Sequence, residues 1–222
     1  MPFVIFLCSN IELLCLKNVK ERDFFRNLLS NICKAKTKDA SYTLYRSARK
    51  DYEMSKIENG HLIDQAKGRD PDAFTELMQL YMQDMYRVAL AILMNDEDAA
   101  DAIQDTILAC WEKIHTLRKR EFFKTWLTRI LINKCYDIRK KRRNCVELEE
   151  YAEPITEDKS DLEFREALAS LDEKYRIIMT LFYSQGYRID EIADMLKLPK
   201  STVQTRLQRG RERLAVYYRK YG

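Results

Sequence analysis

The side chains best placed to do chemistry in this chain are hydrogen-bonding and basic residues near its C-terminus. A predicted helix that starts around Ser201 carries Gln204, Thr205, Gln208 and Arg209 on one polar face. Such side chains in the first turns of a helix can reach base edges and phosphates in the major groove of DNA. The chemistry predicted here is recognition of DNA rather than catalysis.

Residues 186–218 predict the helix-turn-helix that positions this face. Pro199 interrupts the first helix, and Ser201 offers a hydroxyl cap for the second. The apolar positions at helical spacing that can close the two helices together are Ile189, Ile192, Ala193, Leu196, Val203, Leu207 and Leu214. An amphipathic helix pair with a merely solvated basic face remains the alternative at this point.

Charge is segregated along the chain, although the net charge is only +4. Residues 58–112 hold twelve acidic and three basic side chains, residues 118–143 hold eleven basic and two acidic ones, and residues 144–173 are acidic again. Clusters of Lys and Arg neutralise phosphates. Two basic surfaces separated by an acidic connector therefore predict two contacts with nucleic acid.

Three amphipathic helices are predicted upstream of the connector. They cover residues 72–94, residues 99–114 and most of residues 118–143, with residues 95–98 as the break and cap between the first two. In the third, Trp126 and Leu131 fit a core stripe, whereas Phe122 and Phe123 follow a loop and are candidates for stacking on an unpaired base. Packing into the core is the alternative for these two phenylalanines.

The composition argues against several other classes of protein. No apolar run is long enough to span a bilayer, and no basic segment precedes the short apolar run at residues 3–8. The six cysteines lack CxxC spacing, and the sequence has neither a Gly-rich phosphate loop nor metal-ligand spacing. We expect reduced thiols, no metal, no cofactor, no small-molecule substrate and no catalytic residues. A recombinase or resolvase is disfavoured for the same reason.

Four segments, in this order and spacing, resemble the extracytoplasmic-function (ECF) group of the sigma-70 family of bacterial RNA polymerase sigma factors. They are DAFTELMQLY from residue 72, DAADAIQDTILACWEKI from residue 98, FFKTWLTRILINKCYDIRKKRR from residue 122, and the stretch from SLDEKYR to RERL at residues 170–214. Residues 72–143 resemble region 2 and residues 167–214 resemble region 4. The resemblance implies an all-α fold with two small helical domains joined by a flexible acidic linker.

The resemblance also implies a role for each group of candidate residues. Docking on the clamp helices of the polymerase beta-prime subunit is implied for Asp98, Asp101, Gln104, Asp105 and Trp111. Recognition and melting of the minus-10 element, with capture of a flipped base, is implied for Arg118, Lys119, Arg120, Phe122, Phe123, Asn133, Lys134 and Arg139. Reading of the minus-35 element is implied for Lys200, Ser201, Thr202, Gln204, Thr205, Arg206, Gln208, Arg209 and Arg211. Gln204 stands where the family often has a basic residue, so adenine becomes a candidate base there.

The domain division that follows has an N-terminal extension (1–53), region 2 (54–143), an acidic linker (144–163) and region 4 (164–222). The implied partners are core RNA polymerase, through its beta-prime and beta subunits, promoter DNA, and an anti-sigma factor, frequently membrane-bound. The implied location is the cytoplasm. The linker acids could mimic nascent RNA in the polymerase exit path, with a simply solvated linker as the alternative.

Residues 1–53 lie outside the resemblance. Met54 stands where the family normally begins, and Arg49-Lys50-Asp51 could be encoded by a purine-rich ribosome-binding sequence, which predicts translation from Met54. The alternative is a genuine extension in which residues 10–32 form an amphipathic helix that binds a partner or shields region 2.

The runner-up function is a polymerase-independent helix-turn-helix regulator whose upstream helices sense a signal or dimerise. A simple repressor needs no strand-melting element, yet an acidic helix followed by a basic aromatic helix precedes the helix-turn-helix. The sigma-factor interpretation is therefore preferred.

Overall fold

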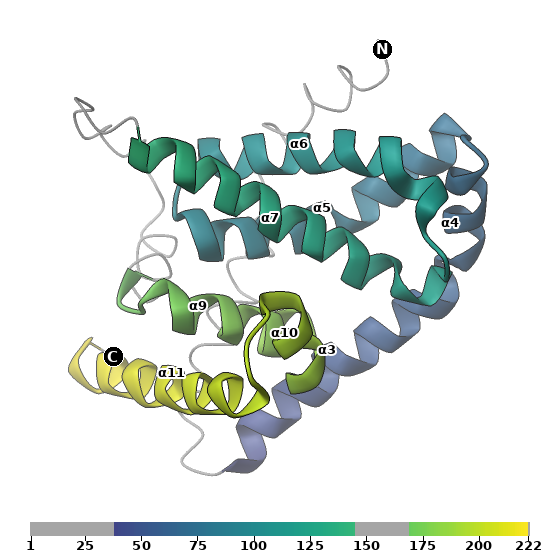
Figure 1. Ribbon diagram of the computed structural model, residues 1–222. Helices are drawn as coiled ribbons and strands as arrows, with labels where there is room; N and C mark the ends of the chain where they lie inside the picture. Colours follow the sequence, from purple (N-terminus) through teal and green to yellow (C-terminus); the bar gives the residue numbers. More distant parts are fainter. Residues whose placement is uncertain (1–37, 145–168, 222) are drawn as a thin grey trace.

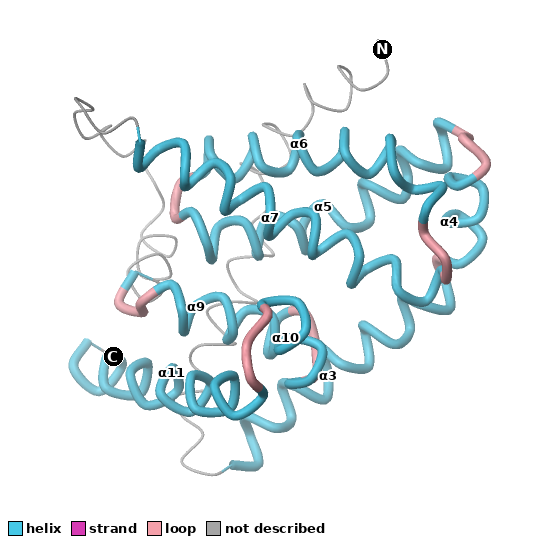
Figure 2. Tube along the Cα trace, viewed as in Figure 1, coloured by secondary structure: helices cyan, strands magenta, loops and turns pink. Residues whose placement is uncertain are grey.

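All regular structure in the described parts of the chain, residues 38–144 and 169–221, is helical (Figures 1 and 2). The first range contains α3 (Lys38–Glu58), α4 (Gly60–Lys67), α5 (Pro71–Leu93), α6 (Asp96–Lys113), the 3-10 turns η1 (Ile114–Thr116) and η2 (Arg120–Phe122), and α7 (Phe123–Asn144). The second contains α9 (Glu173–Met179), the π-helical turn η3 (Thr180–Ser184), α10 (Ile189–Leu196) and α11 (Lys200–Tyr221). This computed structural model agrees with the all-α fold class.

Local backbone chemistry sets the helix ends in the first range. Asp70 caps α5 by accepting hydrogen bonds from two backbone N–H groups, and Pro71 takes the first helical position. Met94 ends α5 in the left-handed conformation, with φ of 55°. Asn95 then caps α6, its side-chain oxygen accepting from the Asp98 N–H at 2.8 Å. The predicted break between the two helices is confirmed, and α6 begins three residues earlier than expected.

Helices α5, α6 and α7 form a bundle that buries their apolar stripes against one another (Figure 1). The fully buried residues in this bundle include Phe74, Leu77, Met78, Ile103, Ile107, Leu127 and Leu131. Burial of each such side chain contributes about 1.5–3 kcal/mol to the free energy of unfolding. The bundle is thus the rigid support for any site built on α6 or α7.

The predicted helix-turn-helix consists of α10 and α11. Lys197 ends α10 in the left-handed conformation, with φ of 54°, and α11 begins at Lys200, one residue before the expected start. The predicted apolar positions Ile192, Val203, Leu207 and Leu214 are all buried. A Cβ atom at Gly210 would lie 3.0 Å from Met179 Cγ, so α11 packs closely on α9 at that point.

The helices of the second range pack directly on the bundle of the first. Arg176 on α9 is 8% exposed and donates hydrogen bonds to the carbonyl oxygens of Ala91 on α5 and of Leu171, at 2.6 and 2.9 Å. Buried apolar residues from both ranges form one continuous cluster. The expected flexible linker lies mostly at residues 145–168, outside the described residues. The two expected domains share a single core in this arrangement.

Helix α3 crosses the expected boundary between residues 53 and 54 without a break. Its Tyr52 is 1% exposed and belongs to the shared core, whereas Met54 is 45% exposed. Residues 45–53 therefore pack as part of the folded unit. The helix expected at residues 10–32 lies outside the described residues.

Candidate nucleic-acid and polymerase interface

The first half of α11 presents most of the expected minus-35 residues to solvent. Val203 and Leu207 are buried, and they fix the opposite face of the helix in the core. The exposed members of the set are Lys200, Ser201, Gln204, Thr205, Gln208 and Arg209. The partly buried members are Thr202, Arg206 and Arg211. Gln208 donates one hydrogen bond to Glu212 at 3.0 Å, which leaves its second N–H and its amide oxygen available to a base.

Arg139 and Arg206 lie near the phenol ring of Tyr136 on α7. The Arg139 guanidinium lies over the Tyr136 ring, 4.7 Å from its centroid. Burial raises the pKa of Tyr136, and the positive charges of Arg139 and Arg206 oppose that rise. Arg139 also forms an ion pair with Glu173 of α9. In this arrangement the expected minus-10 residue Arg139 connects region 2 to region 4.

The segment before α7 presents a cluster of exposed basic side chains. Arg118, Lys119 and Arg120 are all exposed. The Arg120 guanidinium donates to Asp64 at 2.9 Å, a surface pair of small energetic value. Phe122 is 55% exposed at the end of η2. Basic and aromatic groups therefore meet at the start of α7.

Phe123 differs from its neighbour and does not meet the expectation of an accessible stacking ring. Its side chain is 1% exposed, and its ring lies 5.4 Å from Tyr81 and 6.0 Å from Trp126, between ring centroids. The first turn of α7 directs residue 123 into the bundle, so a base cannot reach it in this arrangement. Phe123 is a core residue here.

Two ion pairs join the acidic helix α6 to the basic helix α7. Lys134 lies 3.6 Å from Asp105, and Arg142 lies 2.6 Å from Asp98. Both acids were expected to bind polymerase, and Lys134 was expected to bind DNA. Asn133, also expected at the minus-10 element, is exposed on α7.

The expected polymerase-binding face of α6 combines acidic, amide and apolar groups. Asp101 is exposed and Gln104 is partly buried on this helix. Trp111 packs edge-on against Phe74 at 4.9 Å, so it supports the face from within. Leu108, which the sequence reasoning did not select, is 42% exposed. Its spacing four residues after Gln104 is the signal that could have identified it.

A polar network between the two regions was also missed at the sequence level. Lys124 on α7 lies 2.8 Å from the Asp84 carboxylate on α5, and Gln185 of region 4 donates to the same carboxylate at 3.1 Å. Burial by itself would raise the pKa of Asp84, but the Lys124 charge and hydrogen bond, with Arg87 and Gln185, hold it below its usual value. Lys124 belongs to the basic block, yet it serves packing rather than DNA.

Within the described ranges, no helix combines the length and the apolar character needed to cross a membrane. The same residues contain no group of three or more His, Cys, Asp or Glu side chains arranged to hold a metal ion.

Comparison with known proteins gives a match for each half of the chain. Residues 77–145 match the family described as Sigma-70 region 2, and residues 161–214 match Sigma-70, region 4. RNA polymerase sigma factor SigV of Bacillus subtilis (strain 168) is 31% identical over 134 residues, which cover 58% of this chain and 81% of that protein. ECF RNA polymerase sigma factor SigW of the same strain is 28% identical over 172 residues, which cover 68% of this chain and 92% of that protein.

A solved structure shows the same fold. Sigma factor RpoE from Bartonella quintana, determined in complex with the anti-sigma factor NepR, aligns with a TM-score of 0.55 and 24% identity over 67% of this chain and 98% of that one. The helical bundle and the helix-turn-helix therefore define a two-part transcription factor. The chain belongs to the ECF group of the sigma-70 family of RNA polymerase sigma factors. It binds core RNA polymerase and directs promoter-specific initiation of transcription.

Proposed function

We propose that the exposed face of α11 reads the minus-35 element while η2 and the start of α7 open the minus-10 element. The observation that carries this proposal is the pairing of exposed basic groups with an exposed aromatic ring, Phe122, at one end of a rigid bundle. An aromatic face stacks on an unpaired base without needing a sequence code, and neighbouring cations hold the backbone.

The residues of α11 divide by their position on the helix. Gln204, Thr205, Gln208 and Arg209 are exposed, which supports base contacts, because side chains of these types can pair with base edges in the major groove. Lys200 and Ser201 at the N-terminus of the helix suit phosphate contacts. Gln204 is proposed to read an adenine.

The face of α6 is proposed to dock on the polymerase beta-prime subunit. Asp101 is its exposed charged group and Leu108 its exposed apolar group, while Trp111 holds the helix on the bundle. A small apolar centre with a charged rim is typical of specific protein interfaces.

The domain division is proposed as region 2 at residues 54–143, the acidic linker at 144–163 and region 4 at 164–222. The family matches at residues 77–145 and 161–214 support it. The acidic residues between them, Glu147, Glu149, Glu150 and Glu153, are proposed to mimic nascent RNA in the polymerase exit path. Their positions lie outside the described residues.

An anti-sigma factor is proposed as the inhibitory partner of this chain in the cytoplasm. RpoE was solved in complex with the anti-sigma factor NepR, and the shared fold supports the proposal that this chain also binds an anti-sigma factor. Such a partner would have to complement the α6 face and the basic start of α7.

Run-off transcription with purified bacterial core polymerase tests the proposed function. The full chain is added to a pool of genomic promoter fragments, and discrete transcripts are expected only when both proteins are present. Specific DNA binding in the absence of polymerase, with no transcript in its presence, would instead favour the polymerase-independent regulator.

Two variants of α11 separate base reading from phosphate contact in the same assay. Gln204→Ala is expected to cost about 1–3 kcal/mol at one base position and to relax specificity there. Lys200→Ala is the control, because loss of a phosphate contact weakens binding to all sequences alike. It also reduces the slope of log affinity against log salt concentration by about one. An unchanged base preference for Gln204→Ala would remove this residue from the reading face.

A further inference from the structure

Helix α3 lies across the seam between region 2 and region 4 and contacts both (Figure 1). On the region 4 side, the Tyr45 ring stacks on Phe182 with centroids 4.2 Å apart. The Tyr52 hydroxyl lies 3.2 Å from the Thr125 hydroxyl of α7, which belongs to region 2. The Tyr52 ring also meets the edge of Tyr187 of region 4, at 5.2 Å. One helix thus supplies packed aromatic groups to both regions.

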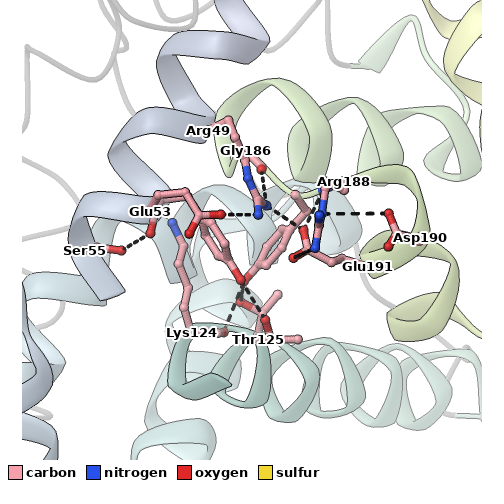
Figure 3. Close-up of polar contacts among 12 residues, drawn as sticks. Arg49, Glu53, Ser55, Lys124, Thr125, Gly186, Arg188, Asp190 and Glu191 are labelled. Carbon is pink, nitrogen blue, oxygen red and sulfur yellow. Dashed lines mark hydrogen bonds and ion pairs between the residues drawn. The ribbon is translucent and has the colours of Figure 1, made fainter. Parts of the chain in front are cut away.

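Arg49 adds a polar link from α3 to region 4 (Figure 3). Its Nη1 donates to the carbonyl oxygen of Gly186 at 3.2 Å and to the Glu191 carboxylate at 2.8 Å. The Arg49 and Glu191 side chains are each only 17% exposed. Burial by itself would lower the pKa of Arg49, but the Glu191 charge and hydrogen bond outweigh this and raise it. The pair is charge-compensated and largely shielded from solvent.

Gly186 lets the backbone of α3 come into direct contact with region 4. Its φ is 71°, and a Cβ atom at this position would lie 2.3 Å from the Ala48 carbonyl oxygen. Only glycine satisfies both the conformation and the close approach. The backbone of α3 therefore packs closely against region 4, and the contact does not consist of apolar side chains alone.

The arrangement that α3 holds brings the two promoter-reading surfaces close together. The Tyr187 hydroxyl donates to the Lys124 carbonyl at the start of α7, and Arg139, whose guanidinium lies over Tyr136 further along the same helix, pairs with Glu173 of α9. Region 4 therefore contacts α7 close to the stretch between residues 122 and 136, which is about 21 Å long. Elements centred at minus-10 and minus-35 lie about 25 base pairs apart, which is about 85 Å of DNA at 3.4 Å per step. Regions 2 and 4 must separate before both elements can be bound.

We propose that α3 is an intramolecular clasp that holds region 4 on region 2 and thereby opposes the separated arrangement needed for promoter recognition. Residues 38–53 of this clasp lie before both family matches, the first of which begins at residue 77 and the second at residue 161. Core polymerase that engages both regions binds the open molecules, so its apparent affinity is the intrinsic affinity multiplied by the open fraction. Weakening α3 therefore raises that affinity.

Charge reversal in the full-length chain tests the clasp. Arg49→Glu removes the hydrogen bonds to Gly186, Glu191 and Glu53 and places a like charge against both of those carboxylates. Tyr45→Ala removes the stacking on Phe182 without touching a fully buried group. Each variant is expected to increase the radius of gyration measured by X-ray scattering without polymerase, and to tighten core binding by about three-fold or more, measured by fluorescence titration. Arg46→Glu, an exposed position on the same helix, is the matched control and should change neither quantity.

The double variant Arg49→Glu/Glu191→Arg provides the second control. Glu191→Arg alone is expected to open the molecule. The double variant should restore compaction in part relative to either single change, because the pair is re-formed with exchanged charges while Glu53 and Arg188 each lose a partner. If Arg49→Glu and Tyr45→Ala match Arg46→Glu in size and in core affinity, the clasp is overturned. A larger radius with unchanged affinity also overturns it. Loss of the run-off transcript at saturating protein would count against the proposed function instead.

Discussion

Two adjacent phenylalanines at the start of α7 have opposite environments and therefore opposite expected effects. Phe122 is more than half exposed beside Lys119 and Arg120, and Phe123 is sealed between Tyr81 and Trp126. The exposed ring is accessible to an unpaired base, and the buried ring is not. Substituting Phe122 therefore tests a role in binding, and substituting Phe123 tests a role in packing.

Phe122→Ala is expected to leave the free energy of unfolding within about 0.5 kcal/mol of the parent chain. Promoter opening, measured by permanganate reactivity of unpaired thymines, should fall by about ten-fold, because stacking on a base contributes about 1–3 kcal/mol. Phe123→Ala is expected to lower the free energy of unfolding by about 3–5 kcal/mol through the cavity it leaves. Equal promoter opening in Phe122→Ala and the parent would exclude Phe122 from base capture.

At the scale of elements, one carboxylate makes polar contacts with both α7 and region 4 from α5. Asp84 accepts from Lys124 and Gln185, and its lowered pKa records that the charged form is favoured in the folded chain. A lowered folded-state pKa means that the unfolded chain binds more protons in acid. The stabilisation is complete above the ordinary aspartate pKa of about 3.9 and is lost as the pH falls through the lower, folded-state value.

Asp84→Asn is expected to lower the free energy of unfolding at neutral pH by about 2 kcal/mol, because hydrogen bonds to a charged group are lost. Denaturant unfolding of the parent and the variant between pH 7 and pH 3 measures the difference, which should shrink as the pH falls below 4. A difference that stays constant across this range would show that Asp84 stabilises the fold through packing and not through its charge. Asp101→Asn, at an exposed acid on α6, is the control.

At the scale of the whole molecule, the folded unit extends upstream of Met54. Tyr52 lies in the shared core, and its loss would expose Tyr187 and Thr125 at the seam. A chain that starts at Met54 lacks this side chain together with Arg49. The predicted translation start at Met54 therefore has a structural consequence that can be measured.

Residues 54–222 are expected to unfold at a temperature about 5–10 °C below that of the full chain, because removal of a buried aromatic side chain costs about 3 kcal/mol. Differential scanning calorimetry measures the two midpoints. Tyr52→Ala in the full chain is the matched comparison and should shift in the same direction. Identical midpoints for the truncated and full chains would show that α3 contributes nothing to the folded unit.

The sequence by itself determined the helices α5, α6, α7, α10 and α11 and the class of protein. Apolar spacing predicted α5, α6, α10 and α11, because an amphipathic stripe must be buried wherever the helix packs. Capping residues such as Asn95 set helix ends through local hydrogen bonds, which depend on near neighbours alone. The exposed face of α11 followed for the same reason, since burial of Val203 and Leu207 leaves the remaining residues outside.

Tertiary structure alone decided which charged and aromatic groups are free to act. Phe122 and Phe123 are the same residue type, and only the register of the turn into α7 separates them. Lys124 belongs to the basic block, yet it is held by Asp84. The packing of α3 and region 4 on region 2 joins side chains more than a hundred residues apart, as between Arg49 and Glu191. Such pairs depend on how complete helices fit together, and no local pattern records that fit.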